Sequence, residues 1–289
     1  MGGLAHMGDW EKVLNIEAPA LAEGSVWERV GGDPISLLDT AVGRNRLGDI
    51  FQEYAGVAER WNLPIVLFAP TWRANQERSK ASANKSAVDF VRQFSRSTGA
   101  LMGPRHDCYQ PAAALSREEA RVFHRWQANE LSDAEFVLVS TMPSVSEALG
   151  IVDVVTVPCV VSFVITARGQ LLDGTPLQDA ISQIDDSANN KPIGYWINCV
   201  HPKTVSDGLA AVGGQAVLHR LLGVQGNTSI LDPRSFSATS DFKGESPASF
   251  GEAMTDLYRR FSVPILGGCC GTRAEHLEEI ARHLVECAR

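Results

Sequence analysis

Short apolar runs alternate with longer amphipathic stretches along most of this 289-residue chain, and this alternation limits the fold more than any other feature. Eight runs have the length of a β-strand and are rich in Val, Ile and Leu, as expected of parallel strands buried on both faces. The expected strands are Ile35–Asp39, Pro64–Pro70, Gly99–Gly103, Glu135–Ser140, Cys159–Ile165, Ile193–Asn198, Leu221–Val224 and Val263–Leu266. Eight strand–helix units predict a (β/α)₈ barrel, a fold that uses roughly 250 residues.

Helix signals lie between most of the expected strands. Ser116 and Glu119 have the spacing of a capping box, and Thr272 and Glu275 repeat it before an apolar stripe over residues 277–285. The alternative fold is an open doubly wound sheet. No Gly-x-Gly-x-x-Gly motif follows the first expected strand, which argues against that alternative.

A single domain over residues 1–289 is expected, because no Pro/Gly-rich linker divides the chain. We expect its core at about residues 35–285, with residues 1–10 either disordered or foreign to the native chain. Residues 227–249 are rich in Ser, Asp, Gly and Pro. A loop of that length in a compact domain is often a functional lid, or else mobile.

The net charge of -8 disfavours binding to nucleic acid or to anionic membranes. The longest apolar runs are far shorter than the roughly 18 residues of a membrane span. The first residues also lack the basic and apolar regions of a signal peptide. We therefore expect a cytoplasmic protein that acts on small molecules, and the sequence leaves its oligomeric state open.

The most informative segment is VPILGGCCGT, at residues 263–272. An apolar strand runs into two glycines, which permit a sharp turn and leave room for a ligand. Cys269 and Cys270 follow at the start of the last helix, whose positive end favours thiolates. In a barrel, this is the carboxyl end of the eighth strand, on the face where active sites lie.

A second strand, in IGYWINCVHP at residues 193–202, also ends in polar residues, Asn198 and Cys199. The ends of strands six and eight point to one mouth of a barrel, so Cys199 is expected to meet Cys269 and Cys270. Three thiolates around zinc leave one position open, as in catalytic sites. For the adjacent pair Cys269–Cys270, a strained disulfide between the two or an incidental pairing are the alternatives. The remaining cysteines, Cys108, Cys159 and Cys287, are interpreted as small buried apolar residues.

The combination of Asn-Cys near residue 199 and Gly-Gly-Cys-Cys-Gly-Thr near the C-terminus resembles the homocysteine S-methyltransferase family. Four further segments are similar in order and spacing, and the resemblance runs from about residue 35 to 285. These segments are LLDTAVG (37–43), APTWRAN (69–75), MGPRHDCY (102–109) and SFVITARGQLLDGTPLQDAI (162–181).

This resemblance implies a (β/α)₈ barrel in which Cys199, Cys269 and Cys270 bind Zn²⁺. It implies transfer of a methyl group to the thiol of homocysteine, giving methionine. The chain has no room for separate cobalamin or folate domains, so a small donor such as S-methylmethionine or betaine is expected. Zinc coordination would convert the weakly acidic thiol into the nucleophilic thiolate.

Two positions depart from the family pattern. After Asp39 the chain has Thr40-Ala41 where the family usually has Gly-Gly. After strand four, Ser140 and Thr141 stand where the family often has Glu-Thr. The family's glutamate would hold the homocysteine ammonium, and a hydroxyl cannot supply its charge. Either Asp39 or another carboxylate such as Glu147 compensates, or the acceptor is a different thiol or a selenol. Glu147 is otherwise interpreted as a solvated helix residue.

The expected substrate-binding residues are therefore Asp39, Thr40, Ser140, Thr141, Asn198 and Asn227. His201 is a candidate fourth zinc ligand, with packing near the mouth as the alternative. Trp72 ends strand two and is either a contact for a cationic donor or an ordinary buried residue. A protein that binds zinc and a thiol ligand without turnover is a further hypothesis, as is a purely structural zinc.

Overall fold

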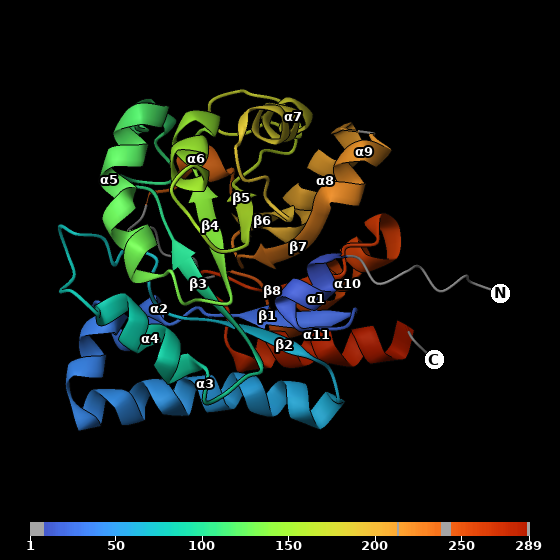
Figure 1. Ribbon diagram of the computed structural model, residues 1–289. Helices are drawn as coiled ribbons and strands as arrows, with labels where there is room; N and C mark the ends of the chain where they lie inside the picture. The colour runs from blue at the N-terminus through green and yellow to red at the C-terminus, as the bar shows by residue number, and fades with distance from the viewer. Residues whose placement is uncertain (1–8, 213, 238–243, 288–289) are drawn as a thin grey trace.

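The computed structural model describes residues 9–212, 214–237 and 244–287. Eight strands pair in parallel, in the order of the sequence, and close into a barrel surrounded by helices (Figure 1). The predicted single-domain (β/α)₈ barrel is confirmed. The strands are β1 (Ala20–Glu23), β2 (Ile65–Phe68), β3 (Ser97–Met102), β4 (Phe136–Met142), β5 (Cys159–Phe163), β6 (Gly194–Val200), β7 (Leu221–Gly226) and β8 (Ile265–Gly268).

The helices fill the connections between the strands, and α11 packs against both α10 and α3. The α-helices are α1 (Asp9–Leu14), α2 (Trp27–Val30), α3 (Ala41–Trp61), α4 (Ala83–Val91), α5 (Arg117–Glu130), α6 (Val145–Val152), α7 (Leu177–Ser187), α8 (Pro202–Val212), α9 (Gln215–Arg220), α10 (Pro247–Phe261) and α11 (Ala274–Cys287). Three short 3-10 helices are η1 (Pro34–Asp39), η2 (Pro111–Ala113) and η3 (Pro233–Ser235). Among the described residues, no helix is both long enough and apolar enough to cross a membrane.

The expected capping box at the start of α5 is confirmed, because the Ser116 and Glu119 side chains each bind the other's backbone N–H. The one expected at the start of α11 is wrong. The Thr272 hydroxyl donates to the Cys269 carbonyl instead, at 2.6 Å. It therefore braces the turn that carries the cysteines rather than the helix that follows.

The expected first strand is wrong. Residues 35–39 belong to η1, whose first residue is Pro34 and whose cap is Asp33. The strand β1 lies earlier in the chain and pairs with both β2 and β8, so the barrel begins at Ala20 rather than near residue 35. The other seven strands are confirmed, with ends that shift by one or two residues.

An apolar layer fills the interior of the barrel below the carboxyl ends of the strands. Trp196 is fully buried in it, and its ring meets the edge of Phe68 at 5.5 Å between centroids. Leu14 and Ile16, from α1 and the segment after it, belong to the same buried cluster. Residues near the N-terminus therefore form part of the packed interior. Helix α1 also contains residues 9 and 10, which were expected to be disordered or foreign to the native chain.

Polar side chains replace this apolar layer at the carboxyl ends of the strands. Side chains two residues apart on a strand share a face. Asn198 therefore points to the same interior as Trp196, and Ser140 to the same interior as Leu138. The barrel thus has a polar mouth at the end where active sites of this fold lie.

Candidate active site at the mouth of the barrel

The mouth brings together three cysteines that lie far apart in the sequence. Cys199 is near the end of β6, and Cys269 and Cys270 directly follow β8. Their sulfur atoms all lie within 4.8 Å of one another, close enough to share a metal ion. The predicted meeting of these three residues is confirmed.

Two of the three cysteines, Cys199 and Cys269, are joined by a disulfide in this structure, and Cys270 is a free thiol. The Cys270 sulfur lies 3.5 Å from that of Cys199 and 3.9 Å from that of Cys269. Sulfur ligands at about 2.3 Å from a tetrahedral zinc lie about 3.8 Å apart. Cys270 therefore fits a shared metal site already, and reduction of the disulfide would free the other two ligands.

The backbone of Cys199 has an unusual conformation at a shift of register between β6 and β7. Its φ of 54° lies in the left-handed region, which costs about 1–3 kcal/mol for a residue with a side chain and is found at functional sites. Asn227 holds this conformation, because its side-chain amide donates to the Cys199 carbonyl at 2.8 Å. Asn227 therefore contacts a site cysteine, as its position after β7 indicated.

The turn that carries Cys269 and Cys270 is also tightly held. The Cys269 N–H donates to the Gly226 carbonyl at 2.7 Å. A Cβ atom on Gly268 would lie 2.4 Å from a Glu23 oxygen, and Gly271 has a φ of 80°, so both positions favour glycine. The glycines of the motif therefore allow close approach on one side of the cysteines and a left-handed turn on the other.

Glu23 is a residue of this region that the sequence analysis missed. It ends β1, is completely buried, and accepts hydrogen bonds from the Gly24, Ser25 and Gly268 N–H groups at 3.2, 3.0 and 2.9 Å. Burial raises the pKa of Glu23 to about 7, against the lowering effect of those hydrogen bonds. With the first strand placed at ALAE, the sequence Glu-Gly-Ser at its carboxyl end would have indicated Glu23 as a candidate site residue.

The Ser140–Thr141 pair lies at the mouth, as predicted, and both residues are buried. The register between β4 and β5 shifts here, and Thr141 has a φ of 60°. The Thr141 N–H donates to the Ser162 hydroxyl at 2.8 Å, while the Trp72 indole donates to the Ser140 carbonyl at 3.2 Å. Backbone strain thus occurs on two strands of the same mouth, at Thr141 and Cys199.

Asn198 also faces the mouth, with one side-chain atom left unsatisfied. Its amide nitrogen donates to Gln225 at 2.9 Å, whereas its buried amide oxygen has no hydrogen-bond partner among the described residues. A buried acceptor without a partner costs about 1–3 kcal/mol. Such an atom suits a ligand that brings an N–H donor.

Asp39 and Thr40 were expected at the carboxyl end of the first barrel strand, and they do not lie there. Asp39 is exposed and pairs with Lys80 at 3.1 Å, and the Thr40 hydroxyl caps α3 by accepting from the Gly43 N–H at 3.0 Å. Neither residue follows a barrel strand, because residues 35–39 form η1. The predicted position of Asp39 and Thr40 at a strand end was wrong, and their observed contacts do not support a role in substrate binding.

Glu147 and His201 also have partners that the sequence did not indicate. Glu147 is fully buried and accepts from the Arg105 and Leu115 N–H groups at 2.9 and 3.2 Å, so it is not the solvated helix residue expected. One ring nitrogen of His201 contacts Glu245 at 2.7 Å, and the other accepts from the Lys203 N–H. Both nitrogens are occupied, which does not support a role for His201 as a metal ligand.

The three cysteines outside the cluster differ in exposure. Cys108 and Cys159 are buried, as expected, and burial raises the pKa of each thiol to about 12. Cys287 is exposed and accepts a hydrogen bond from Arg259, so its expected burial was wrong. In the cluster, burial raises the pKa of Cys270 well above its usual value, and the neighbouring Glu28 raises it further.

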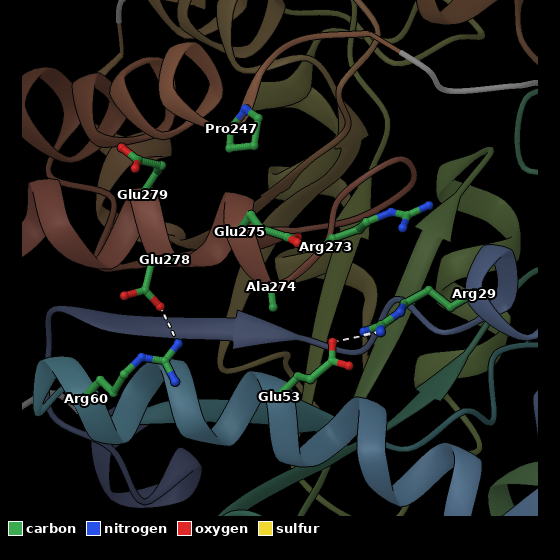
Figure 2. Close-up of a pocket in the computed structure, with 9 residues that line it drawn as sticks. All are labelled: Arg29, Glu53, Arg60, Pro247, Arg273, Ala274, Glu275, Glu278 and Glu279. Carbon is green, nitrogen blue, oxygen red and sulfur yellow. Dashed lines mark hydrogen bonds and ion pairs between the residues drawn. The ribbon is translucent and has the colours of Figure 1, made fainter.

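A separate charged pocket lies outside the barrel, where α2, α3 and the start of α11 meet (Figure 2). Two ion pairs cross it, Arg29–Glu53 and Arg60–Glu278. Its lining residues are Arg29, Glu53, Arg60, Pro247, Arg273, Ala274, Glu275, Glu278 and Glu279. No cysteine lines this pocket, so the candidate site is the barrel mouth.

Fold and site together define a barrel enzyme with a cysteine cluster at its catalytic face. A sequence profile described as homocysteine S-methyltransferase matches residues 65–284, which is most of the chain. The chain therefore belongs to the homocysteine S-methyltransferase family and is a methyltransferase, and membership indicates homocysteine methyltransferase activity. A comparison with curated proteins gave no match.

Solved structures with the same fold include the homocysteine methyltransferase MmuM from Escherichia coli. Its oxidised form has a TM-score of 0.71 at 15% sequence identity, and the alignment covers 94% of this chain and 99% of that one. Its metallated form has a TM-score of 0.68 at 16% identity, covering 94% and 98% of the two chains. At this level of identity, the likeness demonstrates a shared fold.

Proposed function

We propose that this enzyme transfers a methyl group from a small cationic donor to the thiol of homocysteine, with zinc held by Cys199, Cys269 and Cys270. The observation that carries the proposal is the meeting of three sulfur atoms within 4.8 Å at the mouth of a barrel of this family. The E. coli protein of the same fold also has a metallated form. S-methylmethionine and betaine are donors of the required kind.

The chemistry requires a thiolate nucleophile. A free thiol with a pKa near 8.5 is mostly protonated at neutral pH, and a zinc ion with three thiolate ligands and one open position would deprotonate a thiol that binds there. Methyl transfer then forms a carbon–sulfur bond on the acceptor and breaks the bond from carbon to the donor's cationic sulfur or nitrogen. The leaving group departs as a neutral thioether or tertiary amine, and the acceptor becomes methionine.

Among the residues predicted to bind the acceptor, those at the barrel mouth offer neutral oxygens to its ammonium group. Asp39 pairs with Lys80 at the surface, and Glu147 is occupied by two backbone N–H groups, so neither is free to replace the family's glutamate. The unpaired amide oxygen of Asn198 would accept one ammonium N–H, with the Ser140 hydroxyl on the same interior face. Thr141 and Asn227 would support the site through the backbone rather than bind substrate.

Because neither of these two carboxylates is free, a second candidate function also has support, alkyl transfer to a thiol or selenol other than homocysteine. Neutral oxygens do not supply the charge of a carboxylate, so they select less strongly than a carboxylate for an acceptor that carries an ammonium group. Donor recognition by Trp72 has less support, because the Arg73 guanidinium already lies 5.0 Å from the centre of its ring. The requirement for free thiols suits a reducing compartment such as the cytoplasm.

Zinc content per chain tests the proposal, measured on reduced wild type, Cys199→Ser and the control Cys287→Ser, whose cysteine is exposed and outside the cluster. We expect about one zinc per chain in the wild type and the control and none in Cys199→Ser. Reduced wild type that takes up no zinc would overturn the proposal.

Turnover with homocysteine and each donor then identifies the reaction. Methionine formation supports the leading function, whereas an inert homocysteine beside another thiol that is alkylated favours the second candidate. Zinc and thiol binding with no donor consumed would instead indicate a binding protein without turnover.

A further inference from the structure

The N–H groups on both sides of the Cys269–Cys270 pair are bound by carboxylates from the first strand–helix connection. The Gly268 N–H donates to Glu23 at 2.9 Å, and the Gly271 N–H donates to Glu28 at 2.8 Å. Between them, the Cys269 carbonyl accepts from Thr272 and the Cys270 carbonyl accepts from the Thr228 N–H. Glu28 therefore completes the hold on this turn from the solvent side.

Glu28 belongs to a segment that is itself anchored to α3. Its neighbour Arg29 pairs with Glu53 at 2.7 Å (Figure 2). The Arg29 guanidinium also lies 5.6 Å from the Tyr54 ring centre. The Tyr54 hydroxyl also donates to the Ser25 carbonyl at 2.9 Å, just before α2. These contacts anchor α2 to α3, and α2 carries the Glu28 carboxylate that accepts from the Gly271 N–H.

The geometry points to Glu28 as a positioning residue that keeps the Cys270 sulfur in the place a metal requires. Gly271 directly follows Cys270 and adopts a φ of 80°, so its N–H fixes the orientation of the peptide that leaves the cysteine. The Cys270 sulfur is the one of the three already at ligating separation from both others, at 3.5 and 3.9 Å. Groups that orient metal ligands typically change metal affinity 10- to 100-fold when removed.

This inference rests on the proposed zinc site, and it assigns the effect to a hydrogen bond rather than to negative charge. Glutamine at position 28 keeps an oxygen that accepts from the Gly271 N–H, whereas alanine has none. Glu28 is exposed, so neither substitution disturbs the packed interior. Asp39 supplies a matched control, as an exposed carboxylate in the same strand–helix connection that pairs with Lys80 instead.

The test is zinc affinity, measured by competition with a chromophoric chelator on reduced wild type, Glu28→Ala, Glu28→Gln and Asp39→Ala. We expect Glu28→Ala to bind zinc about tenfold more weakly, with Glu28→Gln and Asp39→Ala close to wild type. Wild-type affinity in Glu28→Ala would overturn the inference. An equal loss in Glu28→Gln would also overturn it, because the hydrogen-bond acceptor kept by glutamine would then not be what holds the site.

Amide hydrogen exchange of residues 268–273 separates this inference from the proposed function. Metal-free, reduced Glu28→Ala should lose protection at the Gly271 N–H, and Glu28→Gln should keep it. If the wild type takes up no zinc, the proposed function fails, and the exchange result alone still decides whether Glu28 holds the turn. Unchanged protection in Glu28→Ala would refute that hold whatever the metal content.

Discussion

Replacing Glu23 by glutamine isolates the contribution of one buried carboxyl group to stability. Burial raises the pKa of this group from 4.5 to about 7 in the folded protein. Between these two values, the folded protein keeps a proton that the unfolded chain has released. The stability contributed by that proton is fully present below pH 4.5 and is lost as the pH rises through 7.

The size of this loss follows from the pKa difference. Each unit of difference corresponds to about 1.4 kcal/mol, so the free energy of unfolding should fall by about 3 kcal/mol from this group alone. Glutamine cannot ionise, and it resembles the protonated carboxyl in shape. The wild-type free energy of unfolding, taken relative to Glu23→Gln, should therefore fall by that amount between pH 4.5 and 8.

Urea unfolding of both proteins across this range, reduced and free of metal, measures the difference directly. Because other ionisable groups are common to both, their contributions cancel in the comparison. A difference that does not change with pH would refute the reasoning. A difference that rises with pH would mean that the three backbone N–H donors to Glu23 outweigh the cost of burying its charge.

Three other predictions follow from the described contacts. Trp196→Ala should lower the free energy of unfolding by about 3–5 kcal/mol in urea titrations, because it leaves a cavity beside Phe68 in the barrel interior; a loss below about 1 kcal/mol would contradict the described packing. His201→Ala should retain zinc in metal analysis, because both ring nitrogens already have protein partners, and loss of the metal would make His201 a ligand after all. Protein with the Cys199–Cys269 disulfide closed should take up no zinc until a phosphine reductant opens it, and equal zinc uptake before and after reduction would count against these ligands.

Most of the barrel was predictable because seven of its strands are apolar runs bounded by polar or turn residues. The first strand was not, because β1 has only four residues, ALAE, and ends in a buried carboxyl group. The run PISLLD is more apolar, but Pro34 and the Asp33 cap favour a 3-10 helix there. Local composition could not reveal that β1 gains its stability from pairing with both β2 and β8.

The cysteine cluster was predictable for a different reason. Parallel strands of a barrel direct their carboxyl ends to one mouth, so cysteines at two strand ends must approach each other wherever the strands are recognised. The supporting residues were not predictable in this way. Glu23 and Glu28 reach the cysteines only through the closure of β1 on β8, and the surface pairing of Asp39 with Lys80 depends on η1 replacing the expected strand.

The pairing of β1 with β8 joins the first strand of the chain to the last. During synthesis, β1 leaves the ribosome more than two hundred residues before its second partner. Cys269 and Cys270 emerge together with β8, long after Glu23 and Glu28, whose carboxylates accept hydrogen bonds from the turn that carries the two cysteines. Assembly of the cysteine cluster must therefore coincide with completion of the barrel, and a chain that stops before residue 269 lacks two of its three cysteines.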